Sequence, residues 1–284
     1  MGESHRWGII PMSERGLVDA GLSEKRGRLL EVLGTLDRAA VALSSGVDST
    51  LLLACSVEAL GAGNVLALTA RSPSVPPAAV TEASDFCHGR GIEHLVVDTR
   101  EFELPGFRYN PPNRCYLCKR EMISAFQKVA RSRGIEVVLE GSNADDALCE
   151  RPGAAAVREL GARSPLMEAG LAKADVRSLA REMGLTVWDK PNAACLCSRF
   201  EVGALLEPEA LARVDAAEDA LRGLGFRQVR VRVRDGGDTA RIEVGEDEVA
   251  RLGDAAVAEK ARHAVGALGF GRVEIDERGY RGGR

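Results

Sequence analysis

Four of the seven cysteines stand in two close pairs, Cys115-Tyr-Leu-Cys118 and Cys195-Leu-Cys197. Two pairs of thiolates are a donor set for zinc or for an iron–sulfur cluster, and the sequence alone does not choose between these metals. The single residue between Cys195 and Cys197 is a tight spacing, so a three-cysteine site with one open position also fits. A redox disulfide between Cys115 and Cys118, or four small core residues, are the alternatives. Metal chemistry is the interpretation that we favour.

A second set of reactive side chains lies in the segment Ser44-Ser-Gly-Val-Asp-Ser49, between an apolar run and a helical pattern. Small residues let backbone N–H groups approach an anion, and the start of the next helix adds its positive dipole end. The hydroxyls of Ser44, Ser45 and Ser49 can donate to phosphate oxygens, while Asp48 can hold Mg²⁺. The Gly-Lys-Ser/Thr of a Walker A loop is not present. A serine-rich turn without function is the alternative.

The acidic segment Leu139-Glu-Gly-Ser-Asn-Ala-Asp-Asp146 follows another expected strand. Gly141 permits the close approach of a nucleotide, and Asp145 and Asp146 would complete a metal site. On spacing alone, an acidic turn is the alternative.

Three arginines, Arg230, Arg232 and Arg234, alternate with valines, so they share one face of a predicted strand. Together with Ser198-Arg199 they form a clamp suited to phosphate or carboxylate. For the strand taken by itself, a solvated sheet face is the preferred interpretation.

The elements that position these residues alternate between strand and helix patterns up to residue 188. Strands are expected at 39–43, 65–70, 94–98, 137–140 and 185–188, and helices at 24–36, 50–60, 77–90, 119–133 and 175–183. The first cysteine pair is expected in the Pro- and Asn-rich loop before the fourth of these helices. The alternation predicts an α/β fold with a doubly wound parallel sheet, in which ligands bind at the carboxyl ends of the strands.

The pattern changes at about residue 201. A helix at 207–224, strands at 229–234 and 239–244 around a turn at 235–238, helices at 246–252 and 255–268, and a strand at 272–276 are expected. The predicted domains are an N-terminal extension at 1–23, an α/β domain at 24–200 and a small α+β domain at 201–284.

Composition narrows the function classes. A net charge of −4 and an aromatic content of 4% argue against a nucleic-acid partner. No run of 18 apolar residues is present, so we expect a cytoplasmic protein without membrane association. Met1 and Met12 are both candidate start residues.

The segment Ser44–Ser49 resembles the SGGxDS loop of the PP-loop ATP-pyrophosphatases, with Ser45 in place of the usual glycine beside Gly46. The wider succession of motifs resembles the LarE-type, ATP-dependent pyridinium-3,5-biscarboxylic acid mononucleotide sulfurtransferases from about residue 25 to the C-terminus. The motifs that carry this resemblance are Ser44–Ser49, Asn113–Lys119, Leu139–Asp146, Gly161–Leu166, Ala194–Phe200 and Val229–Arg232.

The resemblance implies an adenine nucleotide alpha hydrolase-like fold and a reaction in two steps. ATP and Mg²⁺ bind at the loop, with Asp48 as a catalytic residue, and a substrate carboxylate is adenylated with release of pyrophosphate. Sulfur then replaces AMP, on the way to a nickel-pincer nucleotide cofactor.

The resemblance also bears on the source of sulfur. One branch of the family sacrifices a cysteine that aligns with Ala194, while the other holds a [4Fe–4S] cluster on three cysteines and carries an extra sulfide on the fourth iron. The Cys-x-x-Cys pair favours the second branch, with Cys115, Cys118 and Cys195 as ligands. Cys197 is an alternative third ligand or a persulfide relay, so both Cys195 and Cys197 are expected to be catalytic.

The substrate implied by the resemblance is a mononucleotide, and its phosphate maps onto a defined set of side chains. That set is Ser198, Arg199, Glu218, Arg230 and Arg232. This assignment reverses the preference for a solvated arginine strand. Sulfide or a sulfur-donor protein is the expected partner, and a homo-oligomer, such as a hexamer, is the expected assembly.

Three other functions remain open at this point. A tRNA-thiolating PP-loop enzyme would need a basic surface, which the composition does not favour. An ammonia-dependent ligase would carry zinc at the cysteines. A non-catalytic nucleotide sensor would bind ATP without releasing pyrophosphate.

Overall fold

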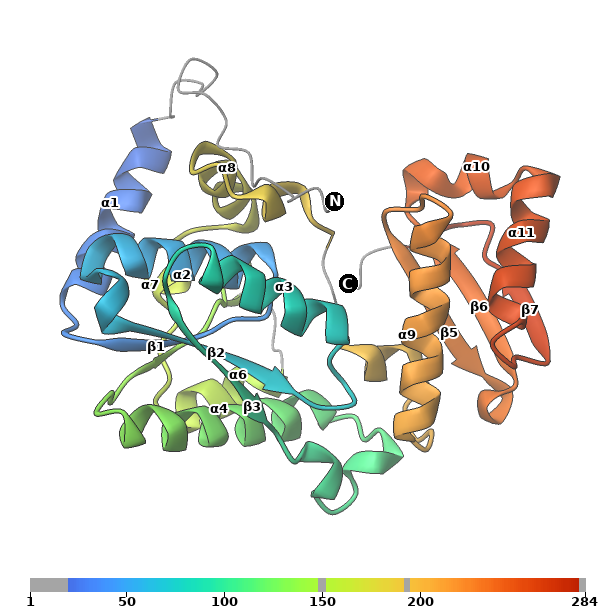
Figure 1. The fold of residues 1–284 in the computed structure, drawn as a ribbon, viewed down its shortest axis with the longest axis horizontal. Helices are drawn as coiled ribbons and strands as arrows, with labels where there is room; N and C mark the ends of the chain where they lie inside the picture. Colours follow the sequence, from blue (N-terminus) through green and yellow to red (C-terminus); the bar gives the residue numbers. More distant parts are fainter. Residues whose placement is uncertain (1–19, 148–151, 192–194, 281–284) are drawn as a thin grey trace, which may run out of the picture. The chain divides into compact units, whose positions relative to one another are not determined.

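The chain forms two units in a computed structural model that describes residues 20–147, 152–191 and 195–280 (Figure 1). The large unit comprises the described residues up to Ser72, Pro77–Glu101, and those from Cys115 to residue 191. The small unit comprises Pro73–Pro76, Phe102–Arg114, and the described residues from Cys195 onwards. The small unit is therefore assembled from three separate stretches of the chain.

The large unit is built on a parallel sheet of four strands in the order β3-β2-β1-β4. These strands are β1 (Ala39–Ala42), β2 (Val65–Arg71), β3 (Glu93–Asp98) and β4 (Val138–Leu139). Ala40 of β1 pairs with Leu66 on one side and with Val138 on the other. The predicted doubly wound α/β sheet is confirmed.

Helices cover both faces of this sheet (Figure 1). On one face, Val41 packs into a core with α1 (Ala20–Gly34), α2 (Val47–Leu60), α3 (Pro77–His88) and α8 (Lys173–Glu182). On the other face, Ala40 packs against α4 (Arg114–Ser132) through Phe126 and Ala130. Because successive strand residues point to opposite faces, an all-apolar strand such as β1 supplies both cores.

The small unit carries a sheet of three strands in the order β5-β6-β7. An antiparallel hairpin joins β5 (Val229–Arg234) to β6 (Thr239–Val244), and β7 (Arg272–Ile275) runs parallel to β6. The valines of β5 are buried while its arginines alternate with them on the other face. The predicted hairpin is confirmed.

The remaining elements are short or connect the main ones. The other α-helices are α5 (Ala144–Ala147), α6 (Pro152–Glu159), α7 (Pro165–Glu168), α9 (Pro208–Gly223), α10 (Val249–Leu252) and α11 (Ala255–Gly266). The 3-10 helices are η2 (Ala62–Asn64), η3 (Glu101–Glu103), η4 (Phe107–Tyr109), η5 (Thr186–Asp189), η6 (Leu196–Arg199), η7 (Asp235–Gly237) and η8 (Glu246–Glu248). Within the described residues, no helix is both long and apolar enough to cross a membrane.

Two expected elements differ from the structure. The fifth strand at 185–188 was a wrong prediction, because this stretch ends in the 3-10 helix η5. Arg177 of α8 donates to the carbonyls of Trp188 at 2.6 Å and Lys190 at 2.9 Å. These two hydrogen bonds hold the segment against α8. The first cysteine pair was expected in a loop, but it occupies the first turn of α4.

The domain limits also differ from those expected from the sequence. The expected boundary at 200/201 falls inside the small unit, which also takes two earlier stretches. Of the expected extension at 1–23, residues 1–19 lie outside the described part, and α1 begins at Ala20.

Candidate active site

The serine-rich loop follows β1 and leads directly into α2, at the carboxyl edge of the parallel sheet. Ser49 closes the loop: its Oγ accepts the N–H of Ser44 at 3.1 Å and lies 3.1 Å from the Ser44 Oγ. The same hydroxyl donates to the carbonyl of Gly46 at 3.2 Å. The backbone N–H groups at the start of α2 are thereby held in the geometry that binds anions.

Ser45 has a backbone conformation that normally belongs to glycine. Its φ is +57°, which costs a residue with a Cβ about 1–2 kcal/mol. Its side chain is buried, and its Oγ donates to the carbonyl of Ala79 in α3 at 2.6 Å. The hydroxyl predicted to face phosphate is thus turned towards α3, where it offsets part of the backbone strain.

Gly141 brings the acidic segment against the serine-rich loop. A Cβ at this position would lie 3.0 Å from the N atom of Ser49 and 3.2 Å from its Cα. Because glycine has no Cβ, the chain leaving β4 can approach the first turn of α2 this closely without displacing it. The two predicted segments therefore meet at one edge of the sheet.

Asp48 is held by two side chains from more distant parts of the large unit. Asn143 Nδ2 donates to Asp48 Oδ1 at 3.0 Å, and Lys173 Nζ forms an ion pair with Asp48 Oδ2. Sequence reasoning missed Lys173. No sequence signal pointed to it, because the helix was expected at 175–183, after this residue, whereas α8 begins at Lys173.

A second lysine contacts the same loop. Lys190 Nζ donates to the Ser45 carbonyl at 3.1 Å and pairs with Glu82 of α3. The position of Lys190 after η5 gave no sequence signal, because the contact depends on how that segment folds back.

Asp145 and Asp146, the candidate metal ligands, brace the backbone here. Asp145 Oδ2 accepts the N–H of Lys173 at 2.9 Å, and Asp146 Oδ2 accepts the N–H of Asn143 at 3.0 Å. Among the described residues, no three His, Cys, Asp or Glu side chains are grouped as metal ligands. These two carboxylates therefore position the Asn143 and Lys173 that hold Asp48.

Glu140 links the sheet edge to the helix that carries the first cysteine pair. Its buried carboxylate accepts from Lys119 Nζ of α4 at 2.8 Å and from the hydroxyls of Ser142 and Ser164. Burial alone raises the pKa of Glu140, but Lys119 and these hydrogen bonds outweigh it and hold the pKa below its usual value. The first turn of α4 is thereby tied to the residue that precedes Gly141.

The cysteine pairs lie in different units, Cys115 and Cys118 in the large unit and Cys195 and Cys197 in the small one. Among the described cysteines, none of these four is joined in a disulfide, and this includes Cys115 and Cys118. Cys115 is exposed, Cys118 and Cys195 are partly exposed, and Cys197 is buried.

The Cys195 thiol has a strongly altered acidity. Its pKa is lowered to about 6 because the Cys197 side chain donates a hydrogen bond to it, with the Cys197 backbone N–H, Arg114 and Ser74 assisting against the effect of burial. A thiolate is the form that binds metals. Its partial exposure favours Cys195 over the buried Cys197 as a ligand.

The residues expected to hold a phosphate come together in the small unit. Arg199 makes a buried bidentate pair with Glu218, at 2.7 and 2.9 Å, and also donates to the Ser198 hydroxyl at 2.9 Å. Arg232 Nη1 donates to the Ser198 carbonyl at 2.8 Å. The Glu218 carboxylate additionally accepts the N–H of Val231 at 3.1 Å, which attaches α9 to β5.

Arg230 completes this group and makes it electropositive. Its guanidinium is buried and lies 4.9 Å from the centre of the Tyr280 ring. Burial, together with the nearby Arg199, lowers the pKa of Arg230. Arg230 thus adds a second buried guanidinium near the buried Arg199–Glu218 pair, whose carboxylate also pairs with exposed Arg222. Arg234, the third arginine of the expected clamp, is exposed at the end of β5.

Comparisons with known proteins extend over nearly the whole chain, although no family model matches it. An uncharacterized protein of Synechocystis sp. is 40% identical over 93% of this chain and 97% of its own length. Pyridinium-3,5-bisthiocarboxylic acid mononucleotide synthase of Lactiplantibacillus plantarum is 37% identical over 93% of this chain and 95% of its own length. The chain belongs to the pyridinium-3,5-bisthiocarboxylic acid mononucleotide synthase family.

A shorter match links part of the chain to a second named enzyme. An NH₃-dependent NAD⁺ synthetase of Methanococcoides burtonii is 39% identical over 72 residues, which are 25% of this chain and 27% of the synthetase.

Proposed function

We propose that this member of the synthase family converts a pyridinium-3,5-biscarboxylic acid mononucleotide into its thiocarboxylate. A substrate carboxylate oxygen attacks the α-phosphorus of ATP, so the acyl-adenylate forms and pyrophosphate leaves. Sulfide then attacks the acyl carbon, a C–S bond forms, the C–O bond to AMP breaks, and one proton is released. Activation is needed because a carboxylate oxygen is a poor leaving group until it belongs to AMP.

The observation that carries this proposal is the 37% identity to the L. plantarum synthase along 95% of its length. The name of that synthase specifies a bisthiocarboxylic acid mononucleotide as product. A match of this extent includes both units, so it supports a shared reaction more strongly than a match to the nucleotide-binding unit alone.

In the large unit, we assign ATP binding to the serine-rich loop and its neighbours. The backbone of Ser45 and Gly46 and the hydroxyls of Ser44 and Ser49 would hold the phosphates, while Gly141 leaves room beside them. Asp48 would hold Mg²⁺, which neutralises phosphate charge.

Lys173 adds a role that the motifs did not indicate. Because Asp48 is already paired with Lys173, an arriving Mg²⁺ would displace the ammonium from Asp48. The released ammonium would then stabilise the negative charge that develops on the departing pyrophosphate.

In the small unit, we assign the substrate phosphate to Ser198, Arg199, Arg230 and Arg232, with Glu218 holding Arg199 in place. The support is electrostatic: two buried guanidinium groups and one buried carboxylate leave positive charge that a bound anion would offset.

For sulfur supply, we propose a [4Fe–4S] cluster on Cys115, Cys118 and Cys195, with Cys197 as the alternative third ligand. The donor chemistry fits, because Cys115 and Cys118 share one helical turn and the lowered pKa of Cys195 favours its thiolate. When bound, the cluster would carry the extra sulfide. Sulfide or a donor protein would replenish it, and we propose a homo-oligomer, such as a hexamer, as the working assembly.

The test is anaerobic purification followed by an assay with ATP, Mg²⁺, sulfide and the mononucleotide diacid. We expect pyrophosphate, AMP and a product whose mass reflects the exchange of oxygen for sulfur. ATP binding without pyrophosphate release would contradict an enzymatic function.

Iron and sulfide quantitation on single Cys→Ala variants tests the cluster separately. Loss of iron from Cys115→Ala, Cys118→Ala and Cys195→Ala is expected. Retention of iron by Cys195→Ala but not by Cys197→Ala would make Cys197 the third ligand, and a colourless protein with zinc would overturn the cluster.

A further inference from the structure

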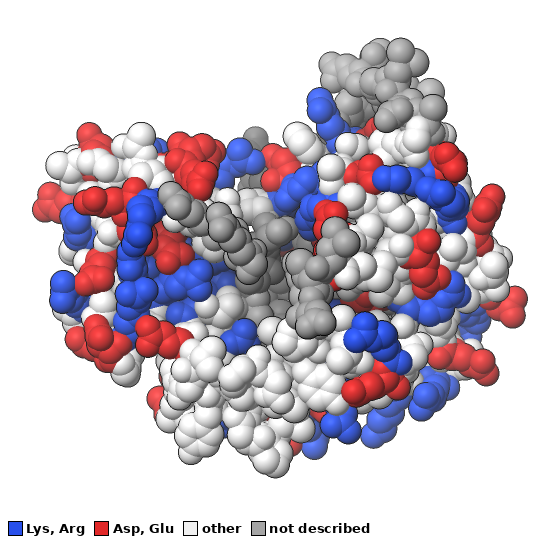
Figure 2. All heavy atoms as spheres, turned by 180° about the vertical axis from the view of Figure 1, so that it is seen from behind, with Lys and Arg blue, Asp and Glu red and all other residues white. Residues whose placement is uncertain are grey.

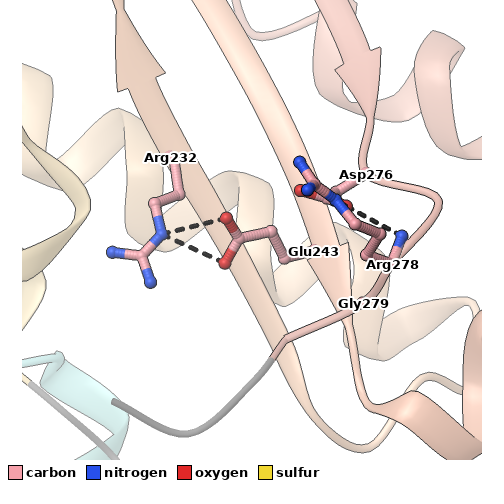
Figure 3. A pocket seen from close by; sticks show the side chains of 5 residues that line it. All are labelled: Arg232, Glu243, Asp276, Arg278 and Gly279. Atoms are coloured by element: carbon pink, nitrogen blue, oxygen red, sulfur yellow. Dashed lines mark hydrogen bonds and ion pairs between the residues drawn. The ribbon is translucent and has the colours of Figure 1, made fainter. Parts of the chain in front are cut away.

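A charged cavity opens on the polar face of the small sheet, beside the proposed phosphate site. It has a volume of about 240 Å³ and is lined by Arg232, Glu243, Asp276, Arg278 and Gly279 (Figure 3). Arg232 belongs both to this cavity and to the phosphate group around Ser198. Lys and Arg side chains form a stripe over the small unit in the rear view (Figure 2).

Each acidic residue of the cavity already holds an arginine. Glu243 accepts from Arg232 Nε at 3.0 and 3.1 Å through its two oxygens. Asp276 pairs with Arg241 and accepts the backbone N–H of Arg278 at 2.8 Å. The carboxylates therefore orient the arginines of this cavity.

Two guanidinium groups retain donors that point to no described acceptor. Arg232 uses its Nε and Nη1, which leaves Nη2 without a hydrogen bond to any described residue. Arg278 Nε lies 3.9 Å from Asp276 Oδ1, beyond hydrogen-bond distance, and its side chain is 75% exposed. The Arg278 guanidinium therefore offers planar N–H pairs, which match the two oxygens of a carboxylate, and Arg232 adds its Nη2 beside them.

The charge at the cavity selects the class of ligand. The lining residues Arg232 and Arg278 bring two positive charges, and Glu243 and Asp276 bring two negative ones. Arg241 does not line the cavity but pairs with Asp276 and adds a third positive charge. The net of one positive charge matches a monoanionic carboxylate. A phosphate dianion would exceed it and would approach two carboxylates.

The size of the cavity indicates which part of a ligand it holds. Its volume is smaller than the roughly 300–1,000 Å³ of pockets that enclose a whole drug-sized molecule. It therefore suits a carboxylated ring edge and leaves the phosphate of the same molecule to the adjoining arginines.

We propose that this cavity is a carboxylate subsite, in which Arg278 and Arg232 bind one ring carboxylate of the mononucleotide while the other is activated. This inference rests on the proposed function and deepens it. It makes Arg278 a specificity-determining residue that distinguishes a ring diacid from ring amides.

Binding measured by calorimetry on the full chain without ATP tests the subsite. The probes are three pyridinium mononucleotides, the 3,5-dicarboxylate, the 3-carboxylate and the 3-carboxamide. The variant Arg278→Gln keeps Asp276 paired with Arg241, and Arg262→Gln, on exposed α11 surface of the same unit, is its control. We expect Arg278→Gln to weaken binding of the dicarboxylate about ten-fold, with no effect on the carboxamide, and Arg278→Lys to restore part of the loss.

Each other outcome has a distinct meaning. Equal weakening of all three probes would assign the cavity to phosphate and overturn the carboxylate subsite. Unchanged binding of all three by Arg278→Gln would also overturn it, while leaving the proposed function intact. Failure of the wild-type chain to bind any mononucleotide would overturn the proposed function, and the subsite with it.

Discussion

Lys173 forms an ion pair with Asp48, although 125 positions separate the two residues in the sequence. The contact fills one carboxylate oxygen of Asp48, and Asn143 fills the other. The serine-rich loop is thus pre-ordered around a neutralised carboxylate.

Replacing Lys173 should separate metal binding from catalysis. We expect Lys173→Met to lower the rate of pyrophosphate release about 100-fold, because one donor to developing charge is lost. Binding of Mg²⁺ to the nucleotide-free protein should not weaken, since Asp48 loses a competing cation. Asp48→Asn should both weaken Mg²⁺ binding and lower the rate of pyrophosphate release.

The control for this prediction is Lys25→Met. It removes a lysine of α1 that pairs with Asp175 of α8 and is not among the residues that hold Asp48. Equal rates of pyrophosphate release for Lys173→Met and Lys25→Met would refute the assigned role.

Replacing Ser45 should reverse the usual order of alanine and glycine. At φ +57°, Ser45→Ala keeps the strained backbone and loses the hydrogen bond to Ala79, so it should lower the free energy of unfolding. Ser45→Gly loses the same bond but relieves the strain, and should be more stable than the alanine variant by about 1 kcal/mol.

Ser84, in the helix α3, provides the matched comparison. There the alanine variant should be the more stable by about 1 kcal/mol. Urea unfolding of the four variants measures both differences in the free energy of unfolding. If Ser45→Ala proved more stable than Ser45→Gly, this would argue against strain in the loop.

Replacing Glu140 should give a pH-dependent loss of stability. The pKa of Glu140 is lowered in the folded protein, so its charge stabilises the fold fully above the unfolded value of about 4.3. This contribution disappears as the pH falls through the lower folded pKa. Glu140→Gln should therefore cost about 1–3 kcal/mol at pH 7 and much less below that folded pKa.

Urea unfolding across this pH range measures the effect, with exposed Glu136→Gln as the control. A stability gap between wild type and Glu140→Gln that does not change with pH would show that the Lys119 pair contributes little.

Replacing Glu218 should destabilise the small unit through Arg199. Glu218→Met leaves a buried guanidinium without its bidentate partner, which typically costs about 3–5 kcal/mol. The double variant Arg199→Met with Glu218→Met removes both charges and should recover much of this loss. Chemical denaturation measures both, and equal instability of the single and double variants would indicate a packing effect instead.

The sequence predicted the strands and loops that carry the site better than the contacts between its side chains. The strands before Ser44 and Gly141 could be placed because apolar runs between turn residues mark buried parallel strands. The segment 185–188 is also largely apolar, but Arg177 donates hydrogen bonds to the carbonyls of Trp188 and Lys190 at its end. The pattern of apolar residues in a short segment does not show whether a side chain of a neighbouring helix will supply these hydrogen bonds.

The residues that sequence reasoning missed share one cause. Lys173 and Lys190 reach the loop only after α8 and η5 pack onto α2, so their importance depends on tertiary structure. The strain at Ser45 was visible as a departure from glycine, but the compensating bond to Ala79 was not.

Because the small unit is assembled from three separate stretches of the chain, it can fold only after the last of them has been synthesised. Residues 73–76 and 102–114 leave the ribosome long before 195–280, with which they belong. During synthesis these two stretches therefore stay without their packing partners until translation is nearly finished. The parallel sheet can form earlier, because its last strand ends at residue 139. A gene fragment that begins at 201 would lack both early stretches, so it would yield an incomplete fold.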